Sequence, residues 1–350
     1  MKQINGQTKT SSWKLWIGLI ISALFLYVAF REVDLSKTWT VIKSTKFLPL
    51  LMIVLVTFFQ YLIRVWRWDL LMEPIQETSF LNRLAAVLIG FAANSVFPAR
   101  LGEFIRANVL GRREGIKSSS VFGTIVVERL FDGFTLLLIL LFGLLGTTFP
   151  KEWDSISGSL RGTGVFLFLF YLLLILFLVG FKYKTKSFLN LLNRVLFFFP
   201  HRLRSKLIEI IRNFSLGLVL TKKPHQWILI IFFSVLLWFS ALYQIELTEQ
   251  SIGLDLPFIA AFLVLTMASL GVMIPSAPGF VGTFHLAVQY GFIFYGVGKE
   301  EALSAAILWH AAVFFPTILY GGIALLFVHL FPAKSSEVPS PPIIEEAIDQ

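Results

Sequence analysis

Long runs of apolar residues, separated by short polar segments, dominate the chain from residue 13 to residue 330. A helix that crosses a lipid bilayer needs about 20 mostly apolar residues. Six runs come close to that length and are predicted to be transmembrane helices: Trp13–Phe30, Phe47–Val65, Val121–Phe149, Gly164–Phe181, Trp227–Leu247 and Ala302–Leu330. The first run ends without a small-x-small cleavage site, so we expect a retained helix and not a signal peptide.

Two further apolar stretches are shorter or broken. Leu84–Phe97 stops at Pro98, and Phe258–Ile274 stops at Pro275 and restarts after Gly282. Their lengths predict helical hairpins that enter the membrane and return to the same side. The predicted fold is an all-α polytopic membrane protein with about six full transmembrane helices and two broken, re-entrant hairpins.

The composition agrees with a chain whose solvent is mostly lipid. Only 15% of its residues are charged and its mean hydropathy is +0.78, whereas a soluble domain has roughly 25% charged residues. We expect a single membrane domain over residues 1–330, followed by a disordered cytoplasmic tail over residues 331–350. The absence of cysteine excludes disulfides, thiolate metal sites and cysteine nucleophiles.

Basic residues in the loops predict the orientation of the chain in the membrane. Residues 182–226 contain ten lysines and arginines and one acid, Glu209, which places this segment on the cytoplasmic side. The resulting scheme places the protein in the inner membrane, with both termini in the cytoplasm. It puts 22 of the 30 lysines and arginines inside and seven outside, with Arg129 in a span. This asymmetry accounts for the net charge of +9 without a nucleic-acid partner.

An internal repeat follows from three landmarks. Trp227 follows Phe47 by 180 positions, Gly282 follows Gly102 by 180, and Gly296 follows Gly115 by 181. The repeats, about 47–149 and 227–330, each contain a span, a broken hairpin and a long span. Because the loop charges start them on opposite sides, they are predicted to be inverted, as in secondary transporters that bind substrate near the membrane midplane.

Three polar patches could carry the chemistry. All three are predicted to line a substrate site. The first patch is Asn94, Pro98, Arg100, Gly102, Glu103 and Arg106; the second is Glu128, Arg129 and Asp132; the third is Pro275, Pro278, Gly279, Gly282, His285 and His310. In the first patch the arginines are expected to face the mouth of a cavity beside the break at Pro98, as a phosphate or head-group site; an ordinary cytoplasmic loop is the alternative. Charges at membrane depth are normally paired and inward-facing, so the second patch, on one helix, is a ligand site or a structural ion pair. The histidines of the third patch titrate near neutral pH when unperturbed, or are simply hydrogen-bonded.

Two other segments are given structural interpretations. Arg64-Val65-Trp66-Arg67-Trp68-Asp69 is typical of an interface anchor at a membrane edge. The alternation of apolar and basic residues over 187–220 predicts an interfacial helix pair that meets anionic lipid on the cytoplasmic leaflet. The chain has no P-loop, GxGxxG, HExxH or GxSxG motif and no Asp-rich metal pair, so we expect no cofactor or metal, and no ATP-driven pump in this chain.

Taken together, Asn94…Pro98-Ala99-Arg100-Leu101-Gly102-Glu103…Arg106, Glu128-Arg129-Leu130…Asp132 and Pro275…Pro278-Gly279…Gly282 resemble the transmembrane domain of lysylphosphatidylglycerol synthases. The match covers about residues 13–330. The resemblance implies a lipid-translocating fold that also occurs as a stand-alone flippase-like family. The domain that attaches the amino acid in the synthases has no counterpart here. His285 falls near a place where the family often has an acid, which bears on the head group recognised.

We therefore expect a non-enzymatic flippase that moves the head group of an anionic phospholipid, aminoacyl-lipid or glycolipid. Arg100, Arg106 and Arg129 would hold its phosphate, and Glu103 and Asp132 would balance that charge or meet an amine. A proton route through Glu103 or His285 is one possible energy source. The alternatives are a membrane-embedded lipid-modifying transferase and a non-catalytic scaffold for such an enzyme.

Overall fold

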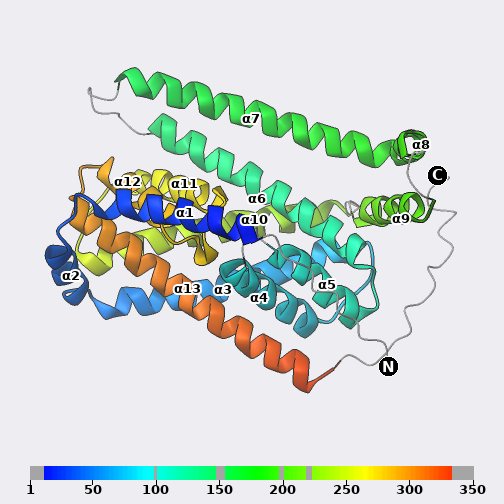
Figure 1. Cartoon of the computed structure of the whole chain (residues 1–350), viewed down its shortest axis with the longest axis horizontal. Coiled ribbons are helices and arrows are strands. Elements are labelled where there is room, and N and C mark those ends of the chain that lie inside the picture. Colours follow the sequence, from blue (N-terminus) through cyan, green and yellow to red (C-terminus); the bar gives the residue numbers. More distant parts are fainter. Residues whose placement is uncertain (1–11, 98–100, 147–153, 197–200, 218–222, 333–350) are drawn as a thin grey trace. The chain divides into compact units, whose positions relative to one another are not determined.

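The computed structural model describes residues 12–97, 101–146, 154–196, 201–217 and 223–332. The regular secondary structure in these residues is helical, which confirms the predicted fold class (Figure 1). The helices are α1 (Ser12–Phe30), α2 (Leu35–Lys43), α3 (Phe47–Met72), α4 (Phe80–Val96), α5 (Gly102–Glu114), α6 (Ser118–Gly146), α7 (Asp154–Tyr183), α8 (Thr185–Val195), α9 (His201–Gly217), α10 (Pro224–Ile252), α11 (Ile259–Met273), α12 (Thr283–Ile293) and α13 (Lys299–Leu330), with a 3-10 turn at Pro278–Phe280.

Each of the six predicted spans corresponds to a helix: α1, α3, α6, α7, α10 and α13. Within the described residues, α3, α10 and α13 are long and apolar enough to cross a membrane by length and composition. The total number of crossings stays a prediction. The sequence patterns did not indicate α2, whose first turn is capped by the Asp34 carboxylate; this accepts hydrogen bonds from the backbone N–H groups of Ser36 and Lys37 at 2.9 and 3.3 Å.

Proline and glycine break the two hairpins where the sequence predicts. Residues before proline are pushed out of the helical region, and α4 ends at Val96, shortly before Pro98. Likewise α11 ends at Met273, and Ile274 before Pro275 is extended, with φ −69° and ψ 125°. The chain resumes as α5 and α12.

The described residues belong to two compact units. Unit 1 comprises Met1–Val54, Asn94–Arg100 and Leu242–Phe315; unit 2 comprises Leu55–Ala93, Leu101–Ala241 and Pro316–Gln350. In unit 1, α12 packs against α11 and α1. In unit 2, α6 packs against α5, α7 and α9, and α6 and α7 run side by side (Figure 1). The buried core of unit 2 includes Val65, Trp68, Leu110, Val121 and Ile125.

The two hairpins cross in the same way, each inside its own unit. A Cβ atom placed on Gly90 of α4 would lie 2.7 Å from the Cβ of Arg106 and 3.0 Å from the carbonyl oxygen of Gly102 in α5. A Cβ atom on Gly271 of α11 would lie 2.7 Å from both the Cβ of Ala287 and the carbonyl oxygen of Thr283 in α12.

The contacts at the two crossings are related by one sequence offset. Residues 271, 287 and 283 each follow their counterparts 90, 106 and 102 by 181 positions. Each second hairpin helix is also followed by a glycine with positive φ, 70° at Gly115 and 79° at Gly296. The counterpart of Gly102 is therefore Thr283, and not Gly282 as the sequence landmarks indicated. The repeated hairpin geometry is a property of the fold; the inversion of the repeats in the membrane remains a prediction.

Large apolar side chains cover the surface of α7. Phe166, Phe170, Leu173 and Phe177 are all more than half exposed. A contiguous apolar face of this kind is unfavourable in water and matches contact with lipid.

Candidate functional site

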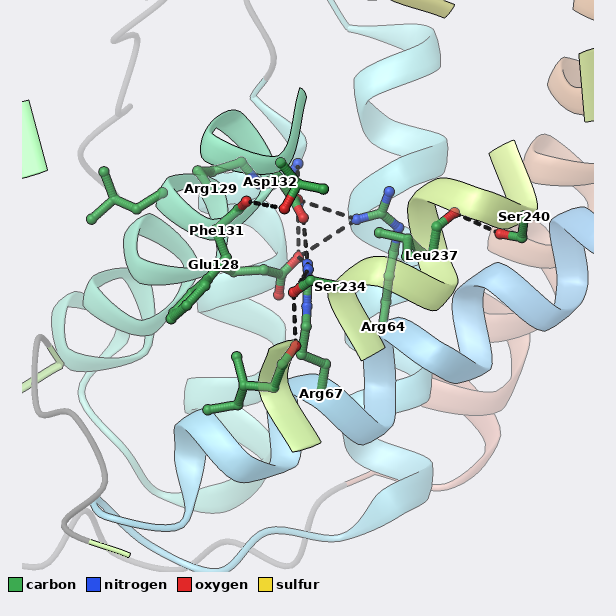
Figure 2. Close-up of polar contacts among 12 residues, drawn as sticks. Arg64, Arg67, Glu128, Arg129, Phe131, Asp132, Ser234, Leu237 and Ser240 are labelled. Atoms are coloured by element: carbon green, nitrogen blue, oxygen red, sulfur yellow. Dashed lines mark hydrogen bonds and ion pairs between the residues drawn. The ribbon is translucent and has the colours of Figure 1, made fainter. Parts of the chain in front are cut away.

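A network of charged side chains lies inside unit 2, where α3, α5 and α6 supply all of its members. From α6 come Glu128, Arg129 and Asp132, from α3 Arg64 and Arg67, and from α5 Glu103 and Arg106. We call these seven residues the arginine cluster. Figure 2 shows Arg64 and Arg67 reaching towards the carboxylates of Glu128 and Asp132.

Glu128 is the centre of the cluster. Its carboxylate accepts two hydrogen bonds from Arg106, at 3.0 Å from Nη1 and 2.8 Å from Nη2, and a third at 2.8 Å from Nη2 of Arg129. Arg67 Nη2 lies 3.5 Å from Oε1 of the same carboxylate. The side chains of Glu128 and Arg67 are 0% exposed and that of Arg106 is 2% exposed. A fully buried carboxylate is thus compensated by several guanidinium groups, as burial of a charge requires.

Asp132 lies on the same face of α6, one turn after Glu128, and forms the second acidic centre. Arg67 Nη1 is 2.7 Å from its Oδ1 and Arg129 Nη1 is 3.3 Å from its Oδ2. Arg67 also donates to the hydroxyl of Ser234 on α10 at 3.0 Å (Figure 2).

The cluster has a partly exposed edge formed by Arg64, Arg129 and Glu103, whose side chains are 16%, 33% and 24% exposed. Arg129 Nε lies 3.6 Å from the Glu103 carboxylate. Arg64 makes long ion pairs, 3.5 Å to Asp132 and 3.8 Å to Glu128. Both guanidinium groups stand over the ring of Phe91, at 4.8 Å for Arg64 and 5.9 Å for Arg129.

Charge and donor count make this edge attractive to an anion. The cluster contains four arginines and three acids, so it has one positive charge in excess. Arginine presents a planar fork of donors that suits phosphate and carboxylate groups. An anionic group beside Arg64 and Arg129 would neutralise the excess.

The structure brings some of the predicted residues of the first two patches together, but not all of them. Glu103, Arg106, Glu128, Arg129 and Asp132 come together in the cluster. However, Arg106 is buried and paired with Glu128, so the expectation that it faces a cavity mouth is wrong. Its aliphatic stem passes Gly90, and its guanidinium lies 3.8 Å from the ring of Trp68.

Two other described members of the first patch, Gly102 and Asn94, are not among the seven residues whose charged side chains form the arginine cluster. Gly102 is the buried first residue of α5, and Asn94 lies in the last turn of α4 within unit 1. Pro98 and Arg100 lie outside the described residues.

Arg64 and Arg67 were missed as site residues because the sequence pattern was interpreted as an interface anchor. That interpretation is wrong for Arg67 and Trp68, which are both 0% exposed. The helix does not end at Val65 but continues to Met72, which turns Arg67 into the protein interior. A signal was present in the sequence: two arginines three positions apart share one helix face, as Arg129 and Asp132 do.

The third patch forms a separate polar centre in unit 1. His285 Nε2 lies 3.3 Å from His310 Nδ1, and the backbone N–H of Gly282 donates to His285 Nδ1 at 3.4 Å. The ring of Phe284 packs against both His310 and Trp309, with centroids 5.0 and 5.3 Å apart. Gly279 and Gly282 have positive φ and are buried, whereas Pro275 and Pro278 are exposed. The two histidines, considered separately from the sequence, therefore act as one hydrogen-bonded unit.

Comparisons with known proteins agree with this picture. Residues 15–321 match a protein family described as the lysylphosphatidylglycerol synthase TM region. A UPF0104 membrane protein of Pyrococcus horikoshii is 24% identical over 328 residues, which cover 89% of this chain and 97% of that protein. Two UPF0104 membrane proteins of Methanocaldococcus jannaschii are 28% and 24% identical, over 67% and 90% of this chain and 93% and 95% of their own lengths.

Proposed function

Because the chain belongs to the lysylphosphatidylglycerol synthase transmembrane-region family, we propose that this multi-pass membrane protein moves a lipid head group between the two leaflets of its membrane. The family links it to lipid handling. The observation that carries the finer proposal is the arginine cluster of unit 2, with its excess positive charge and its partly exposed edge.

The substrate would enter at the edge formed by Arg64, Arg129 and Glu103. One phosphodiester carries one negative charge, which equals the excess of the cluster. In an effective dielectric of about 20, an anion roughly 5 Å from a guanidinium gains about 3 kcal/mol. Glu103 and Asp132 would balance the remaining charge, or would meet an amine on an aminoacylated lipid. Anionic phospholipids and aminoacylated phospholipids carry such a phosphate, and a glycolipid meets the requirement where its head group includes one.

The proposed movement alternates between the two repeats. The equal glycine crossings of α4–α5 and α11–α12 support this idea, since related halves can exchange roles during transport. In addition, Gln60 of α3 donates to Ser240 of α10 at 3.1 Å, and these residues are 180 positions apart. A residue meets its own counterpart where two repeats are related by a twofold axis, so this contact supports a twofold relation between the repeats.

The proposed orientation keeps both termini in the cytoplasm and the protein in the inner membrane. Two helices, α8 and α9, lie where an interfacial pair is predicted. Exposed Leu191, Val195, Leu203 and Ile210 accompany the basic residues of this segment, which supports contact with anionic lipid on the cytoplasmic leaflet.

Lipid movement in proteoliposomes tests the proposal. Vesicles of phosphatidylcholine would contain the purified protein and a labelled phosphatidylglycerol, aminoacylated phosphatidylglycerol, glycolipid or phosphatidylcholine. We expect the protein to move labelled phosphatidylglycerol, whose head group has a net negative charge, faster than zwitterionic labelled phosphatidylcholine, and Arg64→Gln to lose most of that rate. Arg31→Gln is the matched control, since Arg31 is half exposed and pairs with Glu32 outside the cluster.

The outcomes separate the proposed function from its alternatives. Movement that Arg64→Gln loses, while its thermal stability stays near that of wild type, would support a phosphate site at the cluster edge. Folded wild-type protein that moves none of these lipids would contradict a flippase. Recovery of chemically altered lipid would instead indicate a membrane transferase.

A further inference from the structure

A buried acid near the end of α10 forms no ion pair with a basic side chain of the described residues. Glu249 is 2% exposed, and its Oε1 atom has no hydrogen-bond partner among the residues that the structure describes. Glu246, one turn earlier on the same helix, also has a buried Oε1 atom without a partner, although this residue is partly exposed. In contrast, Glu128 and Asp132 of unit 2 are each paired with several arginines.

The surroundings of Glu249 disfavour a negative charge. The charged groups that act on its carboxylate are Glu246 and Asp255, both acids. Lys46 approaches the end of α10 through its backbone N–H, which donates to the Ser251 carbonyl at 2.8 Å. Within the described part of the chain, no ion pair joins a lysine, arginine or histidine to Glu249. The carboxylate also lies in the last turn of α10, at the negative end of the helix dipole.

Comparison of the repeats shows what is missing at this position. With the offset of 180 that relates α3 to α10, the counterpart of Glu249 is Asp69, which pairs with Arg83 of α4 at 2.8 Å. With the offset of 181 that relates the hairpins, the counterpart of Arg83 is Val264 of α11, which is fully buried. The acid is therefore present in both repeats, whereas the cation occurs in the first repeat only.

We propose that Glu249 is a proton-binding site. The carboxylate takes up one proton and becomes a neutral carboxyl group, which removes the high cost of an isolated buried anion. Ionisable residues at membrane depth without a partner commonly belong to proton pathways. The proton reaches Glu249 from the aqueous side onto which the exposed loop around Asp255, directly after α10, opens, the outer side in the predicted topology. Coupling of this proton to lipid movement rests on the proposed function.

Infrared spectroscopy of the full-length protein in lipid nanodiscs tests proton binding directly. We expect the wild-type protein at neutral pH to show the carbonyl stretch of a protonated carboxyl group. This band should be lost in Glu249→Gln and retained in Glu32→Gln, because Glu32 is exposed and paired with Lys299. If the Gln variant does not fold, Glu249→Asp should shift the band. Unchanged spectra in a folded Glu249 variant would overturn the proposal.

Transport measurements test the coupling. Labelled phosphatidylglycerol would be followed in proteoliposomes with an imposed pH gradient, an imposed sodium gradient or neither. We expect the pH gradient to change the wild-type rate, Glu249→Gln to lose this response and Glu32→Gln to keep it. Lipid movement that ignores the pH gradient, or follows sodium instead, would overturn the coupling. If wild-type protein moves no lipid, the proposed function fails, and the infrared result alone decides whether Glu249 binds a proton.

Discussion

The helix crossing at Gly90 gives a prediction whose size follows from the structure. In Gly90→Ala, the new Cβ atom would lie 2.7 Å from the Cβ of Arg106. Carbon atoms in contact are about 3.5–4.0 Å apart, so α4 and α5 must separate locally by roughly 1 Å. Overpacking of this kind costs about 1–3 kcal/mol.

The same displacement acts on the arginine cluster, because Arg106 belongs to α5 and Glu128 to α6. Their two hydrogen bonds, at 2.8 and 3.0 Å, would lengthen beyond the range of a good bond. A hydrogen bond to a charged group contributes about 1.5–3 kcal/mol. If one such bond is lost, we expect Gly90→Ala to reduce the free energy of unfolding by about 2.5–6 kcal/mol in total.

Matched variants separate the two contributions. Gly271→Ala creates the same clash against Ala287 and Thr283, where no ion pair lies at the contact, and should lose only about 1–3 kcal/mol. Gly322→Ala is the control, since a Cβ atom there has nothing within 4 Å. The assay is thermal unfolding of the purified variants in identical nanodiscs, followed by tryptophan fluorescence. If the Gly90→Ala variant is as stable to thermal unfolding as the Gly322→Ala variant, the reasoning is refuted. Equal losses at residues 90 and 271 would show that the Arg106–Glu128 pair tolerates the shift.

Two other features lead to predictions. In Arg106→Met, Glu128 keeps its contacts with Arg129 and Arg67. We therefore expect the free energy of unfolding to fall by about 3 kcal/mol, the lower end of the range for a broken buried ion pair. Arg106→Lys should not restore this stability fully, because lysine lacks the planar fork of donors that binds both carboxylate oxygens. Thermal unfolding checks both, and a wild-type midpoint for Arg106→Met would contradict the pairing. On α9, the hydrogen bond from Lys117 lowers the pKa of Glu209 below its ordinary 4.5. The contact should therefore hold above pH 4.5 and be lost as the pH falls through the lowered value. A spin label on α9 should become more mobile only below that pH. If the label is equally mobile in the wild-type protein and in Glu209→Gln at neutral pH, the contact is contradicted.

Local signals in the sequence were sufficient for the six long helices and for the two broken hairpins, although not for the short helix α2. Proline restricts the residue before it, so the ends of α4 and α11 could be placed from Pro98 and Pro275 alone. The apolar runs likewise predicted the six long helices, because each run has the length that a membrane helix needs. These features depend on the chain over a few turns and require no knowledge of its partners.

The site depends on partners that are distant in the sequence, and here prediction was incomplete. Arg67 follows an apolar run, where an arginine usually marks the membrane edge. It is buried because Asp132, on another helix, compensates its charge at 2.7 Å. Similarly, the predicted end of the span at Leu247 left Glu249 in a loop, whereas α10 continues to Ile252 and buries it. Hydropathy records the cost of burying a charge and cannot record a compensating partner.

The two repeats share one arrangement of helices but carry different side chains at equivalent positions. In unit 2, Arg129 forms an ion pair with Glu103 at 3.6 Å. The residues 181 positions later, His310 and Phe284, pack against each other in unit 1 with ring centroids 5.0 Å apart. The same pair of positions is thus in contact in both units, but charges occupy it in unit 2 and rings in unit 1. Since the geometry is shared, the difference in side chains alone concentrates positive charge in one repeat. The unpaired acid at Glu249 lies in the other. An anion and a proton would therefore be bound in different repeats, and the helices that contribute residues to both units, α3, α4, α10 and α13, connect these repeats along the chain.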